Sequence, residues 1–177
     1  MNTTTRSIAL GAGVALVIIA GFFGWQYFAA QGPVDSPEVA EGPYQVPPMA
    51  GGYTNDVYRF SFSLPQSFSV REMEGVVVIE NAAGDGVQVL ITPIEEDIPN
   101  LTAEIIQTDI PDLAVREPEV VEIGEGRTGL AFLSDNEAFD GASREVWFVF
   151  GGSLYQISTY ERLDPLVQAI FRTWEFF

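Results

Sequence analysis

Carboxylates dominate the side chains of this protein that could take part in chemistry. The 177 residues include 25 Asp and Glu and 8 Arg, with no His, Cys or Lys, so the net charge is −17. Without His and Cys, the chain has no Ser-His-Asp triad, no thiolate nucleophile, no disulfide and no metal site built on those ligands. Without Lys, it has no Schiff-base lysine and no P-loop. Carboxylates, hydroxyls and arginine remain.

Two carboxylates could hydrolyse a glycosidic bond if they were held about 5–10 Å apart. With 25 acidic residues, however, some pairs of neighbouring carboxylates occur on any protein surface. The sequence does not give the distance between the two carboxylates of a pair. An aspartic protease needs Asp-Thr-Gly or Asp-Ser-Gly, and the middle residue is missing at Asp85-Gly86 and at Asp140-Gly141. We therefore predict a non-catalytic protein and keep a carboxylate-based hydrolase as the alternative.

A second candidate chemistry is calcium binding by the loop that ends at Gly141. Asp135, Glu137 and Asp140 supply the hard oxygen ligands that Ca²⁺ prefers. Their spacing is not that of an EF-hand, since the fifth position is Phe139 and the twelfth carries no acid. We interpret the segment as a polar hairpin loop, with Gly141 available for a positive φ, and predict no cofactor.

The N-terminal region has the pattern of a membrane span. No charged residue occurs from Ser7 to Val34, a run of 28 residues. Ile8 to Ala30 would form a helix of about 34 Å, and a bilayer core is about 30 Å thick. A cleaved signal peptide is the alternative, but its apolar region is shorter, about 7–15 residues. We predict a retained anchor helix over 7–30.

The charges around the span predict its orientation. Arg6 precedes it, and the first charges after it are acidic. Because positive charge stays in the cytoplasm, residues 1–6 are expected to be cytoplasmic and the rest of the chain to lie outside. The partners we expect are the membrane, through this helix, and a protein of unknown identity. Nucleic acid is not expected, since its phosphates attract Lys and Arg.

Composition then divides the remainder of the chain into two parts. Residues 31–52 hold five of the eleven Pro residues and four Gly, which predicts an extended linker. Residues 53–177 have the length of a single domain.

Strand patterns dominate the domain. Tyr58 to Leu64 alternates apolar and polar residues and ends at Pro65, which predicts a strand with one buried face. Residues 75–94 predict a hairpin, and Gly151-Gly152 predicts a tight turn between two further strands. Val146 to Phe150 is apolar on both faces, as in a central strand. The seven expected strands cover about 58–64, 75–80, 87–94, 119–123, 127–134, 143–150 and 154–160.

Two helices complete the predicted domain. A short one is expected over about Thr102 to Asp109. The last is expected to begin at Asp164 as N-cap, with Pro165 at the first helical position. Its apolar residues form one stripe facing a sheet: Leu163, Leu166, Val167, Ile170, Phe171 and Trp174. The expected fold class is α+β, an antiparallel sheet of about six or seven strands with both helices packed on it.

Four segments resemble PsbP-like domains, named for an extrinsic subunit of the photosystem II oxygen-evolving complex. They are YRFSFSLP at 58–65, LTAEIIQTDIPDL at 101–113, SREVWFVFGGSLYQISTY at 143–160 and IFRTWEF at 170–176. The chain is similar to membrane-anchored PsbP-related proteins of uncharacterised bacteria, over about 53–177. The resemblance implies the fold and an accessory, non-catalytic role at an extracytoplasmic membrane face. It transfers no functional residue, because the matching motifs are strand and turn residues.

Two function classes follow. One is a binding or accessory module held at the membrane, and the other is a hydrolase or calcium-dependent protein that uses carboxylates. A deep pocket with two carboxylates of raised pKa would favour the second class. An exposed apolar patch would favour the first.

Overall fold

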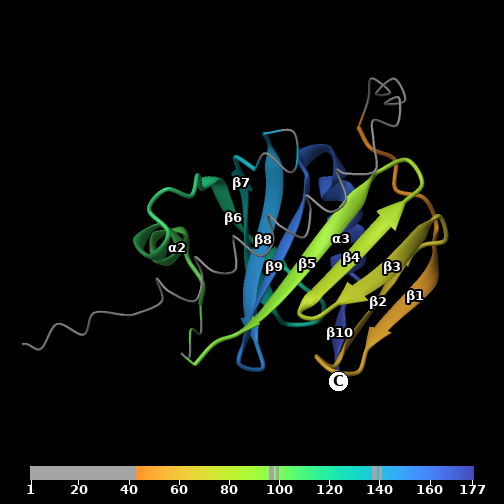
Figure 1. The fold of residues 1–177 in the computed structure, drawn as a ribbon, viewed down its shortest axis with the longest axis horizontal. Helices are drawn as coiled ribbons and strands as arrows, with labels where there is room; N and C mark the ends of the chain where they lie inside the picture. The colour runs from red at the N-terminus through yellow and green to blue at the C-terminus, as the bar shows by residue number, and fades with distance from the viewer. Residues whose placement is uncertain (1–42, 96–97, 99, 137–138, 140) are drawn as a thin grey trace, which may run out of the picture.

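The computed structural model describes residues 43–95, 98, 100–136, 139 and 141–177. The predicted cytoplasmic segment, the anchor helix and most of the linker lie outside the described residues. No helix among the described residues has the length and apolar character needed to cross a membrane. Two antiparallel sheets and two short α-helices make up the described part (Figure 1).

The larger sheet has seven strands in the order β3-β4-β5-β9-β8-β7-β6, all antiparallel. The predicted hairpin is confirmed, since Val77 pairs with Val89. The apolar strand β8 lies between β9 and β7, as its sequence predicts. The strands are β3 (Phe68–Met73), β4 (Val76–Asn81), β5 (Gly86–Pro93), β6 (Arg116–Glu122), β7 (Thr128–Ser134), β8 (Ser143–Phe150) and β9 (Ser153–Tyr160).

A separate sheet of three strands, in the order β1-β2-β10, lies against this sheet. Its strands are β1 (Met49–Asn55), β2 (Phe60–Pro65) and β10 (Glu175–Phe176). We predicted one sheet that includes the strand ending at Pro65, and that was wrong. β2 keeps the expected alternation, but it buries Phe60, Phe62 and Leu64 against the face of the larger sheet.

The domain begins earlier than its composition suggests. We expected the linker to reach Gly52, yet β1 starts at Met49 and pairs with β2. Tyr44 and Val46 also pack against the core. Glycines in this strand and prolines before it resemble a linker in composition, but pairing with β2 supplies the strand with its hydrogen bonds.

The two helices cover opposite faces of the seven-stranded sheet. α2 (Ala103–Asp109) begins as expected, and the Thr102 hydroxyl accepts a hydrogen bond from the Ile105 N–H. A 3-10 turn, η2 (Glu161–Leu163), leads into α3 (Asp164–Phe171). The expectation that Asp164 caps α3 was wrong. It is the first residue of the helix, and its carboxylate binds Arg144 instead.

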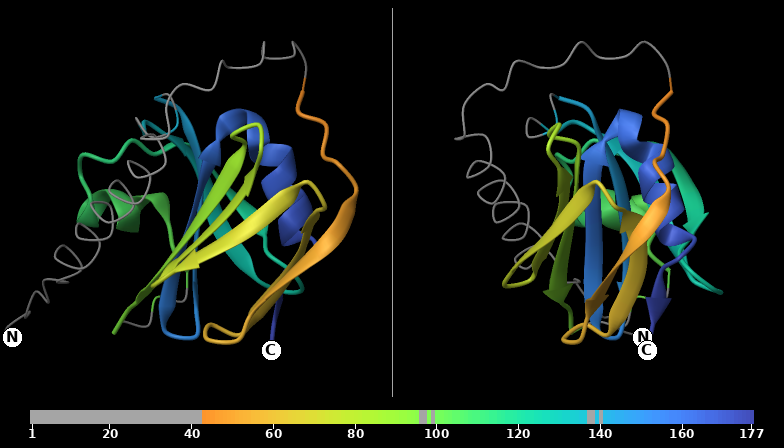
Figure 2. Two further views of the ribbon diagram at one scale, coloured as in Figure 1. Left: turned by 45° about the vertical axis from the view of Figure 1, so that its right-hand side comes forward. Right: turned by 90° about the vertical axis from the view of Figure 1, so that its right-hand side faces the viewer.

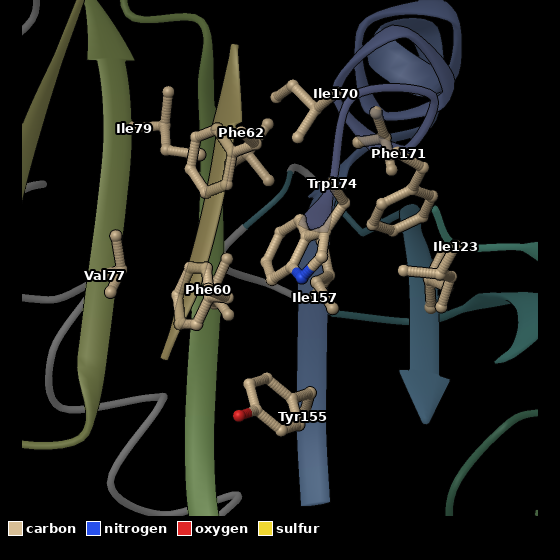
Figure 3. Packing of buried hydrophobic residues seen from close by; sticks show 14 of the residues in the cluster. Phe60, Phe62, Val77, Ile79, Ile123, Tyr155, Ile157, Ile170, Phe171 and Trp174 are labelled. Carbon is tan, nitrogen blue, oxygen red and sulfur yellow. The ribbon is translucent and has the colours of Figure 1, made fainter. Parts of the chain in front are cut away.

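The main core lies between the larger sheet on one side and α3 with the three-stranded sheet on the other. Its centre is Trp174, which follows α3 and is 2% exposed. The indole stacks on Phe60 with ring centres 4.6 Å apart and on Phe62 at 4.9 Å (Figure 3). A smaller core lies under α2, where Ile106 packs with a group on β7 and β8. That group is Leu130, Phe132 and Trp147.

Candidate functional site

Of the calcium candidates, Asp135 is exposed. Asp135 Oδ1 lies 2.7 Å from Arg116 Nη1, so this carboxylate forms an ion pair with β6. Glu137 and Asp140 lie outside the described residues. Among the described residues no three carboxylates come close enough together to hold a metal ion.

The described parts of this loop are attached to the sheet. The backbone N–H groups of Phe139 and Gly141 donate to the Asn136 carbonyl oxygen at 2.9 and 3.1 Å. Phe139 is buried and meets the Tyr160 ring edge-on, with centroids 5.2 Å apart. We call residues 135–142 the β7–β8 loop, and Phe139 is the described residue of it that packs against the sheet.

A buried carboxylate lies beside this loop. Glu145 is on β8 and is 5% exposed. Its Oε1 accepts a hydrogen bond from the Ser143 hydroxyl at 2.6 Å. Its Oε2 accepts one from the Ser158 hydroxyl at 2.6 Å and a longer one from Trp147 Nε1 at 3.4 Å. The Asn136 side chain is a further hydrogen-bond partner. All four partners are neutral.

Burial raises the pKa of the Glu145 carboxyl, and the hydrogen bonds from Ser143, Ser158, Trp147 and Asn136 act against that rise. A raised carboxyl pKa is one mark of a functional site. Here both oxygens accept hydrogen bonds from the protein's own groups, and the described residues bring no second carboxylate to the cluster. The pair of carboxylates that a glycoside hydrolase uses is not assembled by the described residues.

The neighbouring residue Arg144 points to the opposite face of β8. It is also buried, and its guanidinium binds two carboxylates. Nε donates to Asp164 Oδ1 at 2.8 Å, and Nη2 donates to Glu119. The ion pairs join β8 to α3 and to β6. Since both partners satisfy the guanidinium, this network holds elements together and leaves no free cation for a substrate.

An apolar pocket lies between α2 and the sheet. Ile94, Leu101, Ile106, Ile110 and Trp147 are among the residues that line it, and one carboxylate, Asp109, borders it. Desolvation raises the pKa of Asp109. The cavity has a volume of about 20 Å³, which is room for a single water molecule. It is too small to enclose a metabolite in this conformation.

Three exposed apolar side chains lie on two turns and the chain end at one end of the molecule. Val57 in the β1–β2 turn is 80% exposed, Phe177 is 51% exposed and Met73 at the end of β3 is 44% exposed. Hydrogen bonds between Arg59 and Phe177 bring the last residue to the β1–β2 turn. The β3–β4 turn also lies there, since a Cβ on Gly75 would be 3.9 Å from the Tyr58 hydroxyl. We call Val57, Met73 and Phe177 the apolar end.

The apolar end is far from the point where the described chain begins. In Figures 1 and 2 the chain enters at the top, and β1 runs down to its turn with β2 near residue 177. The one other large apolar side chain strongly exposed among the described residues, Val120 at 73%, is on the edge strand β6.

Comparison with solved structures finds related folds. Cyanobacterial PsbP from Synechocystis sp. PCC 6803 matches 82% of this chain and 100% of its own, with 13% identity and a TM-score of 0.46. The fold resembles that of cyanobacterial PsbP. A crystal structure from Bacteroides thetaiotaomicron VPI-5482 matches 73% of this chain and 49% of its own, with 13% identity and a TM-score of 0.50. No protein-family model and no curated protein matches the chain.

At this identity the likeness concerns the fold and carries no function. The notable side chains of the described residues were not singled out from the sequence. Arg144 and Glu145 were placed within the strand expected over 143–150, and Val57 and Met73 fell outside the expected elements. The signal for the first pair was available, because two adjacent charged residues in a central strand must both be buried, one on each face.

Proposed function

We propose that this protein is a membrane-anchored domain outside the cytoplasm that binds a protein partner through its apolar end. The observation that carries the proposal is the exposure of Val57, Met73 and Phe177 on two turns and the chain end at one end of the domain. These are three of the four large apolar side chains strongly exposed among the described residues. Single exposed apolar residues are ordinary, whereas a contiguous exposed apolar patch marks an interaction site; we propose that these three side chains form one.

Three of the charges around the apolar end are acidic and one, Arg59, is basic and bound to Phe177, a balance that favours a protein over a lipid surface. Asp56 lies beside Val57, and Glu72 and Glu74 lie on either side of Met73, all of them exposed. An anionic bilayer would be repelled by these carboxylates. A protein surface with apolar side chains at its centre and Arg or Lys around them would complement both features.

The buried polar groups form their hydrogen bonds and ion pairs within the fold, which supports a binding role over a catalytic one. Arg144 joins three elements through ion pairs, and both Glu145 oxygens accept hydrogen bonds from within the fold. Neither group is directed at an open cleft that the described residues form. The sequence supports the same role, because it lacks the side chains that most catalytic sites use.

The anchor is the second part of the proposal. Its support is the uncharged run of 28 residues from Ser7 to Val34. Residues 31–42 would span at most about 37 Å at 3.1 Å per residue. The described chain begins at the end of the domain opposite the β1–β2 turn (Figure 2). A domain held in this way would direct its apolar end away from the bilayer, toward a partner in the extracytoplasmic space.

The test uses charge introduced at the apolar end. A Val57→Asp/Met73→Asp double variant of the tagged full-length chain is compared with Val120→Asp, which places the same charge on an exposed valine elsewhere. Proteins that copurify from native membranes after mild cross-linking are identified. We expect one partner to be retained by the wild type and by Val120→Asp and lost from the double variant, at equal abundance of all three chains. Equal retention by the double variant would contradict the proposed surface.

Anchoring is tested separately by protease treatment of intact, wall-stripped cells. Digestion of the domain, together with a mature N-terminus ahead of residue 7, is the expected result. A protected domain would contradict the orientation, and a mature chain that begins near Pro33 would contradict the retained anchor.

A further inference from the structure

Two of the arginines are bound differently from the others in the described part of the chain. Arg59 and Arg127 form no ion pair with a described Asp or Glu, and both lie over aromatic rings. This is unexpected, because acidic residues outnumber basic ones by 25 to 8. Four other arginines do bind carboxylates, namely Arg71, Arg116, Arg144 and Arg162.

Arg127 is held in place by two rings just before β7. Its guanidinium carbon lies 3.9 Å from the centre of the Phe150 ring and 5.1 Å from the centre of the Phe176 ring. These two rings contact each other, with centres 3.9 Å apart. The backbone is also held, since the Arg127 carbonyl accepts a hydrogen bond from the Ile123 N–H at 2.9 Å. The side chain is therefore oriented although the residue is exposed.

The stacking of Arg127 leaves its hydrogen-bond donors available. Arginine stacks on a ring through the face of the guanidinium, while its five N–H groups point outward in the guanidinium plane. No described residue accepts a hydrogen bond from this side chain. The planar array of donors matches the two oxygens of a carboxylate, which arginine can bind through two parallel hydrogen bonds. An arginine that is already oriented loses less freedom when it binds.

Arg127 is connected to the apolar end through β10. Phe176, under the guanidinium, is followed directly by Phe177. Arg59 lies over the Phe177 ring, 5.6 Å from its centre, and donates to the Phe177 carbonyl oxygen. A continuous series of contacts thus joins the β6–β7 turn, the last two residues and the β1–β2 turn.

The charges along this end of the domain are arranged unevenly. Glu72 and Glu74 lie at the β3–β4 turn, at one edge of the seven-stranded sheet. Arg127 lies at the β6–β7 turn, at the other edge. A partner that covers the apolar end would therefore meet acids on one side and an available arginine on the other. Such a pattern favours one orientation of the partner and disfavours the reverse one.

We propose that Arg127, oriented by Phe150 and Phe176, binds an aspartate or glutamate side chain of the protein partner. This inference rests on the function proposed above, because the partner is the one bound at the apolar end. It adds the chemistry of that partner: apolar side chains at the centre, basic groups toward the β3–β4 turn and a carboxylate toward Arg127.

Photo-cross-linking by titration tests this contact. The full-length chain, with a photoreactive amino acid at position 57, is added at increasing concentration to solubilised native membranes from cells that lack it. The concentration that gives half of the maximal adduct is measured. Arg127→Gln should raise this concentration on the order of tenfold, the equivalent of one lost charge-assisted hydrogen bond. Arg127→Glu should raise it further, because two carboxylates would then face each other. Both variants lose the ring stacking, so a difference between them reports the charge on the partner.

Arg172 provides the matched control. It is exposed and has neither an ion pair nor a ring contact with the described residues, so Arg172→Gln and Arg172→Glu should leave the concentration unchanged. Arg127→Lys keeps the charge and should lie between the wild type and Arg127→Gln, which keeps the test decisive if Arg127→Glu does not fold.

The outcomes separate this inference from the proposed function. The carboxylate contact is overturned, with binding at the apolar end intact, if the wild type forms the adduct and Arg127→Gln matches it. It is equally overturned if Arg127→Glu does not exceed Arg127→Gln, or if Arg127→Lys is no better than Arg127→Gln. Absence of any adduct from the wild-type chain would overturn both the carboxylate contact and the apolar end as a binding surface.

Discussion

Replacing Gly124 by alanine should destabilise the domain severely, because this glycine touches the backbone at the centre of the core. Gly124 follows β6 with a φ of +59°, and a Cβ there would lie 2.0 Å from the Trp174 carbonyl oxygen. Separations below 3.0 Å essentially never occur for real Cβ atoms. The obstacle is backbone and cannot rotate away, so either the turn or Trp174 must move.

The cost can be estimated from the contacts that such a movement disturbs. The left-handed backbone disfavours any residue with a Cβ by about 1–2 kcal/mol. Displacement also strains the hydrogen bond from the Gly124 N–H to the Phe171 carbonyl, at 2.9 Å, worth about 0.5–1.5 kcal/mol. Loosening of the Trp174 indole adds part of the roughly 3–5 kcal/mol that complete loss of such a side chain costs. Together these terms give roughly 3–5 kcal/mol, a large share of the roughly 5–15 kcal/mol of a typical domain.

Gly126 provides a matched control in the same turn. Its φ is +74° and a Cβ would meet nothing within 4 Å, so alanine should cost only the backbone term of about 1–2 kcal/mol. Urea denaturation of residues 43–177, followed by tryptophan fluorescence, compares the two variants with the wild type. The expected order of midpoints is wild type, Gly126→Ala and then Gly124→Ala. Equal losses in the two variants would refute the close contact between Gly124 and Trp174.

Three further predictions follow from the packing and the charges. Trp174→Ala should lower the free energy of unfolding by about 3–5 kcal/mol, whereas Val120→Ala on the exposed edge strand should change it little; urea midpoints of both variants check this, and similar losses would contradict the central position of the indole. A chain that starts at Pro43 should melt at a higher temperature than one that starts at Tyr53, because the shorter chain loses half of β1 and the packing of Tyr44 and Val46; identical melting curves would place the domain boundary where composition suggested. Because burial raises the pKa of Glu145 above 4.5, the stabilisation that comes from its protonation is complete below that value and is lost as pH rises through the folded-state pKa. The free energy of unfolding of the wild type relative to Glu145→Gln should therefore be greatest in acid and fall toward neutral pH, and a difference that is constant with pH would show that Glu145 does not titrate in this range.

Local patterns predicted the elements that depend on nearby residues. The β4–β5 hairpin, the Gly151-Gly152 turn and helix α2 were all expected at nearly their observed positions. Each depends on side chains within a few residues of one another. Gly151 and Gly152 have φ values of 58° and 74°, as the favoured two-residue hairpin turns require.

Elements that depend on distant pairing were missed. β1 contains two adjacent glycines, β3 ends in three exposed residues, and β10 has only two residues. None of them has a clear period of its own, and each becomes a strand because a partner supplies hydrogen bonds. The division into two sheets was missed for the same reason, since the alternation in β2 predicts a buried face but not what covers it.

The candidate site was even less accessible to sequence reasoning. Charge along the chain drew attention to Asp135, which is an exposed ion-pair partner of Arg116. Glu145 is distinguished by its surroundings, and these come from β9, from β8 itself and from the β7–β8 loop. The apolar end likewise depends on two turns and the last residue lying at the same end of the domain. Neither arrangement has a signature in any single segment.

The central claim, that the protein acts by binding a protein through its apolar end, is tested most directly by site-specific photo-cross-linking in native membranes. A photoreactive amino acid is placed at position 57 or, as the control, at position 120, in the full-length chain, and both sites are solvent-exposed valines. We predict one discrete heterologous adduct from position 57 after irradiation and none from position 120. No adduct at position 57, or the same adducts from both positions, would contradict the claim.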